Sequence, residues 1–168
     1  MKLTRHLAVG LVVLATGATA ALSYFAGRVD MAPDAAFTRL DGSAARISHL
    51  QGKVVLVNFW ATTCTICVRE MPQLVATHQK FSARGFETLA VAMSYDPPSS
   101  VVNFTESRRL PFTVVIDNTG SVARSFGDVK LTPTTVLINK RGEIVKRYVG
   151  EPDFAAMNQL IDALLAEA

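Results

Sequence analysis

The two cysteines of this 168-residue chain, Cys64 and Cys67, are separated by only two residues. A thiolate can attack a disulfide, and a second thiol one helical turn away can then release the product, so a close pair can exchange disulfides. Structural disulfides in small secreted domains are usually more numerous and more widely spaced, and a pair this close cannot connect distant parts of a fold. We therefore interpret the pair as a reaction centre.

The cysteine pair stands between a predicted strand and a predicted helix. Residues 54–59 are apolar and rich in β-branched side chains, which predicts a strand buried on both faces. Apolar side chains then recur at helical spacing until Gly85, which ends the helix. The residues of this apolar face are Met71, Leu74, Val75, His78 and Phe81.

This position at the start of a helix predicts different roles for the two thiols. Unpaired amides and the helix dipole favour negative charge at a helix N-terminus. Cys64 is therefore expected to have a lowered pKa and to attack as the thiolate. Cys67 lies one turn further along and is expected to face inward and to resolve the mixed disulfide. A Cys-x-x-Cys pair in this setting is typical of thioredoxin-like redox proteins.

The rest of the chain alternates predicted strands with predicted helices. Strands are expected over residues 37–40, 45–48, 88–94, 113–116, 134–138 and 143–149, and helices over residues 99–109, 121–126 and from Pro152 onward. The first two and the last two strands flank turns and form hairpins. This order predicts an α/β fold with a mixed central sheet and helices on both faces.

Several segments together resemble the TlpA/ResA-like thiol–disulfide oxidoreductases. The resemblance is strongest in Asn58-Phe59-Trp60-Ala61-x-x-Cys64-x-x-Cys67-x-x-Glu70-Met71-Pro72, and it continues in Leu110-Pro111-Phe112, in Val129-x-Leu131-Thr132-Pro133-Thr134-Thr135 and in residues 138–144. It implies a thioredoxin-like fold that opens with a β-hairpin. It also implies disulfide exchange in the bacterial envelope, as in cytochrome c maturation. No cofactor is expected besides the Cys64–Cys67 disulfide.

The resemblance also implies a surface for substrates. Pro133 is expected to follow a cis peptide bond and to face the two sulfurs, which would expose the backbone of Thr132 for pairing with an extended peptide. Trp60 is expected to contribute to the same substrate-binding surface.

Other positions near the cysteines are expected to adjust the chemistry. Glu70 is expected to be a catalytic carboxylate beside the sulfurs, and the alternative is an exposed helical glutamate. Thr65 and Ile66 are expected to tune the reduction potential. Thr63 and Ile66 depart from the bulky residue and the proline usual in the family, and Asn58 stands where thioredoxins have a buried aspartate. These departures leave the direction of electron flow open.

Residues 7–26 form an uncharged apolar run that follows Lys2 and Arg5. About twenty apolar residues are enough for a helix to cross a bilayer, and the preceding basic residues favour a cytoplasmic N-terminus. Residues 1–30 are predicted to be a membrane anchor, residues 31–36 a linker and residues 37–168 the domain. A signal peptide cleaved near residues 18–20 is the alternative. Both interpretations place the domain outside the cytoplasm, facing the periplasm.

The charge distribution argues against a nucleic-acid partner. Three of the 17 basic residues, Lys2, Arg5 and Arg28, flank the apolar run, and the remaining 14 balance the 14 acidic residues. A formally neutral domain lacks the basic surface that nucleic acids require. The expected partners are instead exported proteins with dithiols or disulfides, together with a thiol electron donor in the membrane.

Two other functions remain as alternatives to an envelope disulfide reductase. A copper-binding or chaperone-type module would need more soft or imidazole ligands near the cysteines. A peroxiredoxin-like peroxidase would need a proline and a threonine ahead of Cys64, where this chain has Val57 and Ala61. A zinc site needs four ligands, and His49 and His78 are interpreted as ordinary surface or core residues. No metal site is predicted.

Overall fold

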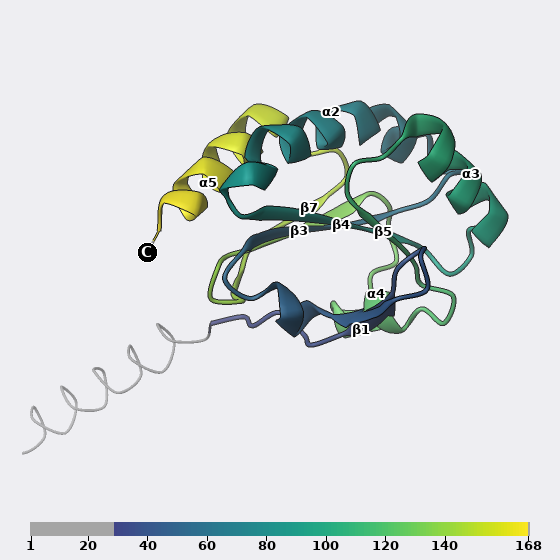
Figure 1. The fold of residues 1–168 in the computed structure, drawn as a ribbon, viewed down its shortest axis with the longest axis horizontal. Helices are drawn as coiled ribbons and strands as arrows, with labels where there is room; N and C mark the ends of the chain where they lie inside the picture. Colours follow the sequence, from purple (N-terminus) through teal and green to yellow (C-terminus); the bar gives the residue numbers. More distant parts are fainter. Residues whose placement is uncertain (1–28, 168) are drawn as a thin grey trace, which may run out of the picture. The chain divides into compact units, whose positions relative to one another are not determined.

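The computed structural model describes residues 29–167, which contain a five-stranded mixed sheet and a separate two-stranded hairpin (Figure 1). The strands are β1 (Ala36–Thr38), β2 (Ala44–Arg46), β3 (Val54–Trp60), β4 (Phe86–Ala92), β5 (Thr113–Ile116), β6 (Thr134–Ile138) and β7 (Ile144–Val149). The helices are α2 (Thr65–Phe81), α3 (Pro98–Arg108), α4 (Ser121–Ser125) and α5 (Phe154–Ala166), with 3-10 turns η1 (Ile47–Leu50) and η2 (Ser82–Arg84). The predicted α/β class with an opening hairpin is confirmed.

The predicted anchor over residues 7–26 and the alternative cleavage site lie outside the described residues. Within residues 29–167, none of the helices combines the length and the apolar character needed to cross a membrane.

Strand β3 is the centre of the large sheet, whose order is β5-β4-β3-β6-β7. It pairs in parallel with β4 and antiparallel with β6, and all seven of its residues are buried. This burial on both faces explains its continuous apolar sequence. Because β3 runs directly toward Cys64, the most enclosed strand of the domain positions the redox pair.

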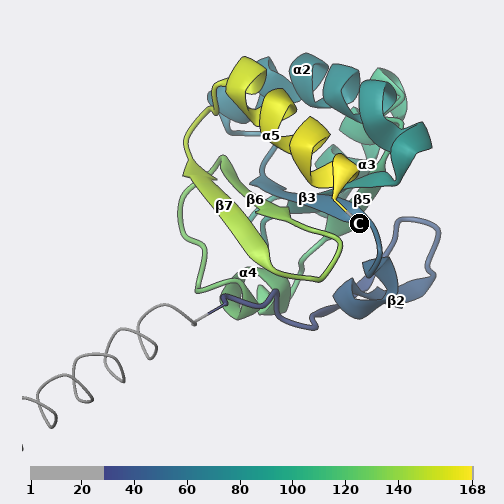
Figure 2. The same cartoon turned by 90° about the vertical axis from the view of Figure 1, so that its left-hand side faces the viewer.

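Two apolar cores lie on opposite faces of the sheet (Figures 1 and 2). Helices α2, α3 and α5 cover one face, and the β1–β2 hairpin, η1 and α4 cover the other. The side chains of β3 alternate between the two cores, as the period of two in a strand requires. Those of Val54, Leu56 and Trp60 face the helices α2 and α5, whereas those of Val55, Val57 and Phe59 face the hairpin.

Individual residues determine where α2 with η2 ends and where α5 begins. Helix α2 ends at Phe81 and continues into the 3-10 turn η2, and Gly85 caps that turn with a φ of 91°, the left-handed conformation that glycine adopts without strain. Pro152 was expected to begin the last helix, but α5 begins two residues later. The side chain of Asp153 caps it by accepting the N–H groups of Ala155 and Ala156, and this cap determines the start of the helix.

The start of the domain is joined to the turn between β6 and β7. Met31 forms an antiparallel bridge with Glu143, and the Ala32 N–H donates to the carbonyl of Gly142 at 2.8 Å. This turn follows the C-terminal end of β6, whereas Pro133 precedes its N-terminal end. Residues 31–36, expected to be a linker, therefore pack on the domain at the opposite end of β6 from Pro133.

Candidate active site

The two cysteines form a disulfide at the N-terminus of α2. Cys64 is the N-cap residue, and its Sγ accepts a hydrogen bond from the Cys67 N–H at 3.2 Å. Cys64 is partly exposed, whereas Cys67 has no exposed surface. In the reduced protein the same amide and the helix dipole favour a thiolate at Cys64. Cys64 is thus the cysteine that can be attacked or can attack.

A tight turn brings the chain from β3 to Cys64. The Cys64 N–H donates to the Ala61 carbonyl at 3.1 Å. Within this turn, Thr62 donates twice to the carboxylate of Asp96, from its N–H and from its hydroxyl, each at 2.6 Å. Asp96 is 2 % exposed.

Asp96 was not among the site residues predicted from the sequence. Its position follows from the sheet, because β3 and β4 are parallel neighbours and their carboxyl ends meet at one edge. A polar residue just after the second of two such strands is the signal that could have identified it.

Glu70 lies one helical turn beyond Cys67 and has no exposed surface. The alternative of an exposed helical glutamate is therefore wrong. The Asn58 side-chain amide donates to Glu70 Oε1 at 3.1 Å and to Thr135 Oγ1 at 3.0 Å. Asn58 and Thr135 are also direct partners in the β3–β6 register. A polar cluster thus spans three elements beneath the disulfide-bearing turn of α2.

Burial raises the pKa of Glu70 from 4.5 to about 7. The hydrogen bond from Asn58 and the charge of Arg69 lower this pKa, and the charge of Glu151 raises it, but desolvation has the largest effect. Glu70 Oε2 has no hydrogen-bond partner within the described part of the chain. A carboxyl group that titrates near neutral pH can exchange protons with thiols during the reaction.

The loop before β6 lies at the same edge of the sheet. The Thr132–Pro133 bond is cis, as the resemblance implied, and the carbonyl of buried Pro133 accepts the Gly150 N–H at 2.8 Å. The Thr134 hydroxyl donates to the Leu131 carbonyl. The Tyr95 hydroxyl lies 3.3 Å from Thr132 Oγ1 and connects this loop to the one that carries Asp96.

Trp60 does not lie on the surface that a substrate would contact. It has no exposed surface, and its ring packs against Phe104 with centroids 5.2 Å apart. Trp60 is the last residue of β3 and has the same parity as Val54 and Leu56, so its side chain points into the core under α2 and α3. The expected substrate-binding role of Trp60 is corrected to a packing role.

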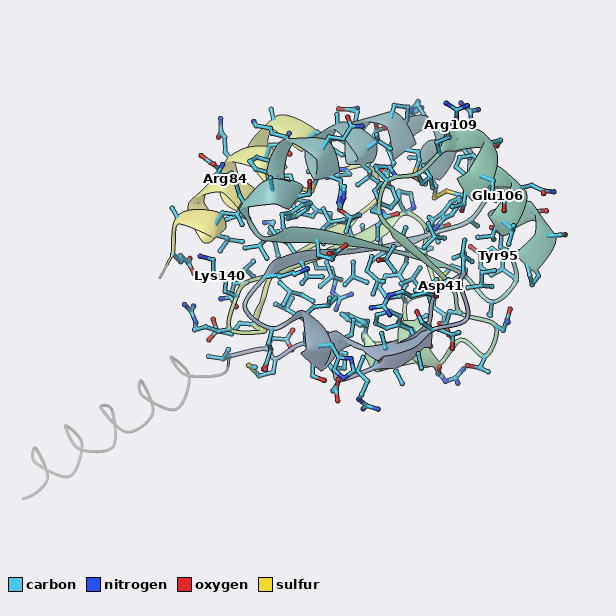
Figure 3. The ribbon with its side chains drawn as sticks, in the orientation of Figure 1. Asp41, Arg84, Tyr95, Glu106, Arg109 and Lys140 are labelled. Atoms are coloured by element: carbon cyan, nitrogen blue, oxygen red, sulfur yellow. A yellow bond between two sulfur atoms is a disulfide. The ribbon has the colours of Figure 1, made fainter. Side chains whose placement is uncertain are left out.

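The surface at the disulfide end of the sheet is partly apolar. Four large apolar side chains are exposed at this end of the sheet: Ile66 at 40 %, Tyr95 at 58 %, Leu131 at 64 % and Val149 at 62 %. Figure 3 shows the disulfide as a yellow bond at the end of the molecule where Tyr95 is labelled, whereas Lys140, in the β6–β7 turn, lies at the other end. Thr65 is also exposed.

Residues 29–167 contain no group of three or more His, Cys, Asp and Glu side chains placed to hold a metal ion. His78 is buried, with Nδ1 at 3.2 Å from Thr88 Oγ1 and with Phe86 and Phe112 beside its ring. Burial lowers its pKa. His78 is thus a core residue in contact with its neighbours.

The sequence is similar to one protein family and to named relatives. The Redoxin family model matches residues 28–161. A protein of Geobacillus kaustophilus named thiol-disulfide oxidoreductase ResA is 36 % identical over 155 residues, which cover 89 % of this chain and 88 % of that protein. The protein of the same name from Bacillus subtilis is 34 % identical over 143 residues, covering 82 % and 79 % of the two chains.

Solved structures share the fold. A thiol:disulfide interchange protein of the thioredoxin family from Chlorobium tepidum superposes with a TM-score of 0.76 and 26 % identity, covering 83 % of this chain and 99 % of the other. The thioredoxin-like fold expected from the sequence is confirmed.

Proposed function

The chain belongs to the Redoxin family and, within it, to the TlpA/ResA-like thiol–disulfide oxidoreductases, and from this premise we propose that it is a disulfide reductase of the bacterial envelope. It takes electrons from a thiol donor in the membrane and passes them to disulfides of exported proteins, with apocytochrome c as the candidate substrate. The observation that carries the proposal is the partly exposed Cys64 at the start of α2, with Cys67 buried.

The reaction uses both sulfurs in turn. The Cys64 thiolate attacks one sulfur of the substrate disulfide, forming a mixed disulfide and releasing the other substrate sulfur as a thiolate. The Cys67 thiolate then attacks Cys64 Sγ, which restores the Cys64–Cys67 disulfide and releases the second substrate sulfur. Two electrons pass from the protein to the substrate. The two protons of the protein dithiol end on the two substrate thiols, and the membrane donor later returns two electrons and two protons.

The residues around the cysteines support these roles of Cys64 as the attacking thiol and Cys67 as the resolving thiol. Glu70 is buried one turn beyond Cys67, and with its pKa near 7 it can accept the Cys67 proton and return it. Thr132 and Pro133 offer a backbone for an extended substrate peptide, and Ile66 lies on the exposed rim beside the disulfide. Thr65 and Ile66 together determine the local polarity at the attacked sulfur.

The direction of electron flow depends on the redox conditions of the compartment. An exported Cys-x-x-Cys pair without a reductant becomes oxidised, so a reductase needs the thiol donor proposed here. Residues 7–26 supply the route to the envelope, as a membrane anchor or as a cleaved signal peptide.

Trapping of partners tests the exchange reaction. Cys67→Ser, produced in cells with the N-terminal segment intact, should accumulate mixed disulfides that dithiothreitol dissolves, because the resolving thiol is absent. Cys64→Ser should accumulate far fewer, since Cys67 is buried. Equal trapping by the two variants would overturn the assigned roles.

The reduction potential tests the direction. A value near −270 mV, as in thioredoxin, supports a reductase, whereas a value near −120 mV would make the protein an oxidant. The captured proteins should carry paired cysteines and be exported or membrane-bound; exclusively cytoplasmic captives would contradict the proposed location.

A further inference from the structure

Asp96 is a buried carboxylate that the exchange reaction described above does not use. It is 2 % exposed and lies in the loop after β4. No ion pair reaches it within the described part of the chain. Its charge is stabilised by two short hydrogen bonds from Thr62. Hydrogen bonds to an ionised group are roughly twice as strong as neutral ones, which allows the carboxylate to remain buried without a cation.

These hydrogen bonds place the carboxylate close to the attacking sulfur. Thr62 is two residues before Cys64, and the hydrogen bond between the Cys64 N–H and the Ala61 carbonyl folds these residues into a tight turn. A turn of this kind holds its first and fourth Cα atoms less than about 7 Å apart. The Asp96 carboxylate is therefore on the order of 10 Å or less from Cys64 Sγ, which is about the distance over which charges interact at physiological ionic strength.

The other charged and titratable groups around the cysteines come from different elements. Glu70 lies on α2, Tyr95 lies beside Asp96, and Arg69 of α2 is paired with Glu151 from the segment before α5. Arg69 thus already has an anionic partner.

We propose that Asp96 is a positioning residue of the redox site whose buried negative charge, held against the turn by Thr62, disfavours the Cys64 thiolate and lowers the reduction potential of the Cys64–Cys67 pair. The inference rests on the proposed function, because a low potential is what a reductase requires. The thiolate exists only in the reduced protein, so a charge that destabilises it shifts the equilibrium toward the disulfide.

The variant Asp96→Asn separates the charge from the geometry. Its amide oxygen can accept the Thr62 N–H and its amide N–H can donate to the Thr62 hydroxyl, so both contacts have a counterpart while the charge is lost. Asp96→Ala removes the contacts as well. Asp162→Asn is the matched control, because it removes one negative charge from an exposed site on α5.

The experiment equilibrates each full-length variant with glutathione at pH 7 and follows the fraction of alkylated thiols. We expect Asp96→Asn to shift the equilibrium toward the dithiol by about three- to tenfold, where tenfold corresponds to about 30 mV for this couple. The pH profile of Cys64 alkylation should move to lower pH in the same variant. Asp162→Asn should leave both values at those of the wild type.

Asp96→Ala should shift the equilibrium at least as far and also slow the exchange, because the turn before Cys64 loses its support. If Asp96→Ala does not fold, Asp96→Asn still tests whether the charge of Asp96 affects the redox equilibrium. An equilibrium and a thiol pKa unchanged in Asp96→Asn, or changed equally in Asp162→Asn, would overturn the inference. These differences between variants are independent of the absolute wild-type potential, on which the reductase assignment depends.

Discussion

Replacing Glu70 with glutamine should make the protein more stable above neutral pH. The folded state raises the pKa of this buried carboxyl group from 4.5 to about 7. Between these two values the folded protein keeps a proton that the unfolded chain has released, so stability falls as the pH rises through this window. Below pH 4.5 both states are protonated and the group contributes nothing. Glutamine cannot ionise, and its side-chain oxygen can still accept the hydrogen bond from Asn58.

The size of the effect follows from the pKa difference. Each pKa unit corresponds to about 1.4 kcal/mol, so the shift gives an upper bound of roughly 3 to 4 kcal/mol at pH 8. Local relaxation and water entering the site lower this figure, and we expect Glu70→Gln to gain about 2 kcal/mol over the wild type at pH 8 and close to nothing at pH 4.

Urea unfolding of the oxidised proteins between pH 4 and pH 8 measures this difference directly. Glu106→Gln is the matched control, because Glu106 is exposed on α3. If wild type and Glu70→Gln lose stability in parallel between pH 4.5 and pH 7, the buried carboxyl group is not the cause and the argument from desolvation is refuted.

Three further predictions concern reactivity, capping and docking. In the reduced protein, Glu70→Gln should move the pH profile of Cys64 alkylation to lower pH, because an ionised carboxylate nearby raises a thiol pKa; an identical profile would leave Glu70 without influence on the sulfurs. Asp153→Ala should cost about 1 kcal/mol in urea unfolding by removing the cap of α5, whereas Asp162→Ala, at an exposed ion pair, should cost less than about 1 kcal/mol; equal costs would contradict the capping role. Leu131→Ser should slow exchange with protein disulfides several-fold and leave exchange with small disulfides unchanged, because Leu131 is 64 % exposed beside the loop before β6; equal slowing of both would exclude a docking contact.

Local sequence patterns predicted most of the fold. The bounds of β5 (residues 113–116) and β6 (residues 134–138) agree with the expectation residue for residue, because each is a short run rich in β-branched residues bounded by turn residues or proline. The strand–Cys-x-x-Cys–helix arrangement is likewise contained in one continuous segment. A pattern contained in one continuous segment can be recognised from the local sequence alone, and the folded protein keeps the predicted secondary structure there.

Contacts between distant segments could not be predicted in the same way. Asp96 is 34 residues from Thr62, and Thr135 is 77 residues from Asn58. Each pairing depends on which strands become neighbours, and strand order is not visible in local composition. Trp60 is a case in which the local sequence did contain the answer. Its burial follows from the alternation of side chains that begins at Val54, whereas the resemblance to the family implied a substrate-binding role.

The attachment of Met31 beside Glu143 has a mechanical consequence. Seven residues of β3 separate that end of the sheet from the turn before Cys64, a span of about 20 Å at 3.3 Å per residue. The chain therefore enters the domain at the end of the sheet opposite to the reactive sulfur. A force applied to the chain before Met31 therefore acts on the bridge between Met31 and Glu143 before it reaches any residue of the turn before Cys64. Disulfide exchange at Cys64 can then proceed while such a force acts on the domain.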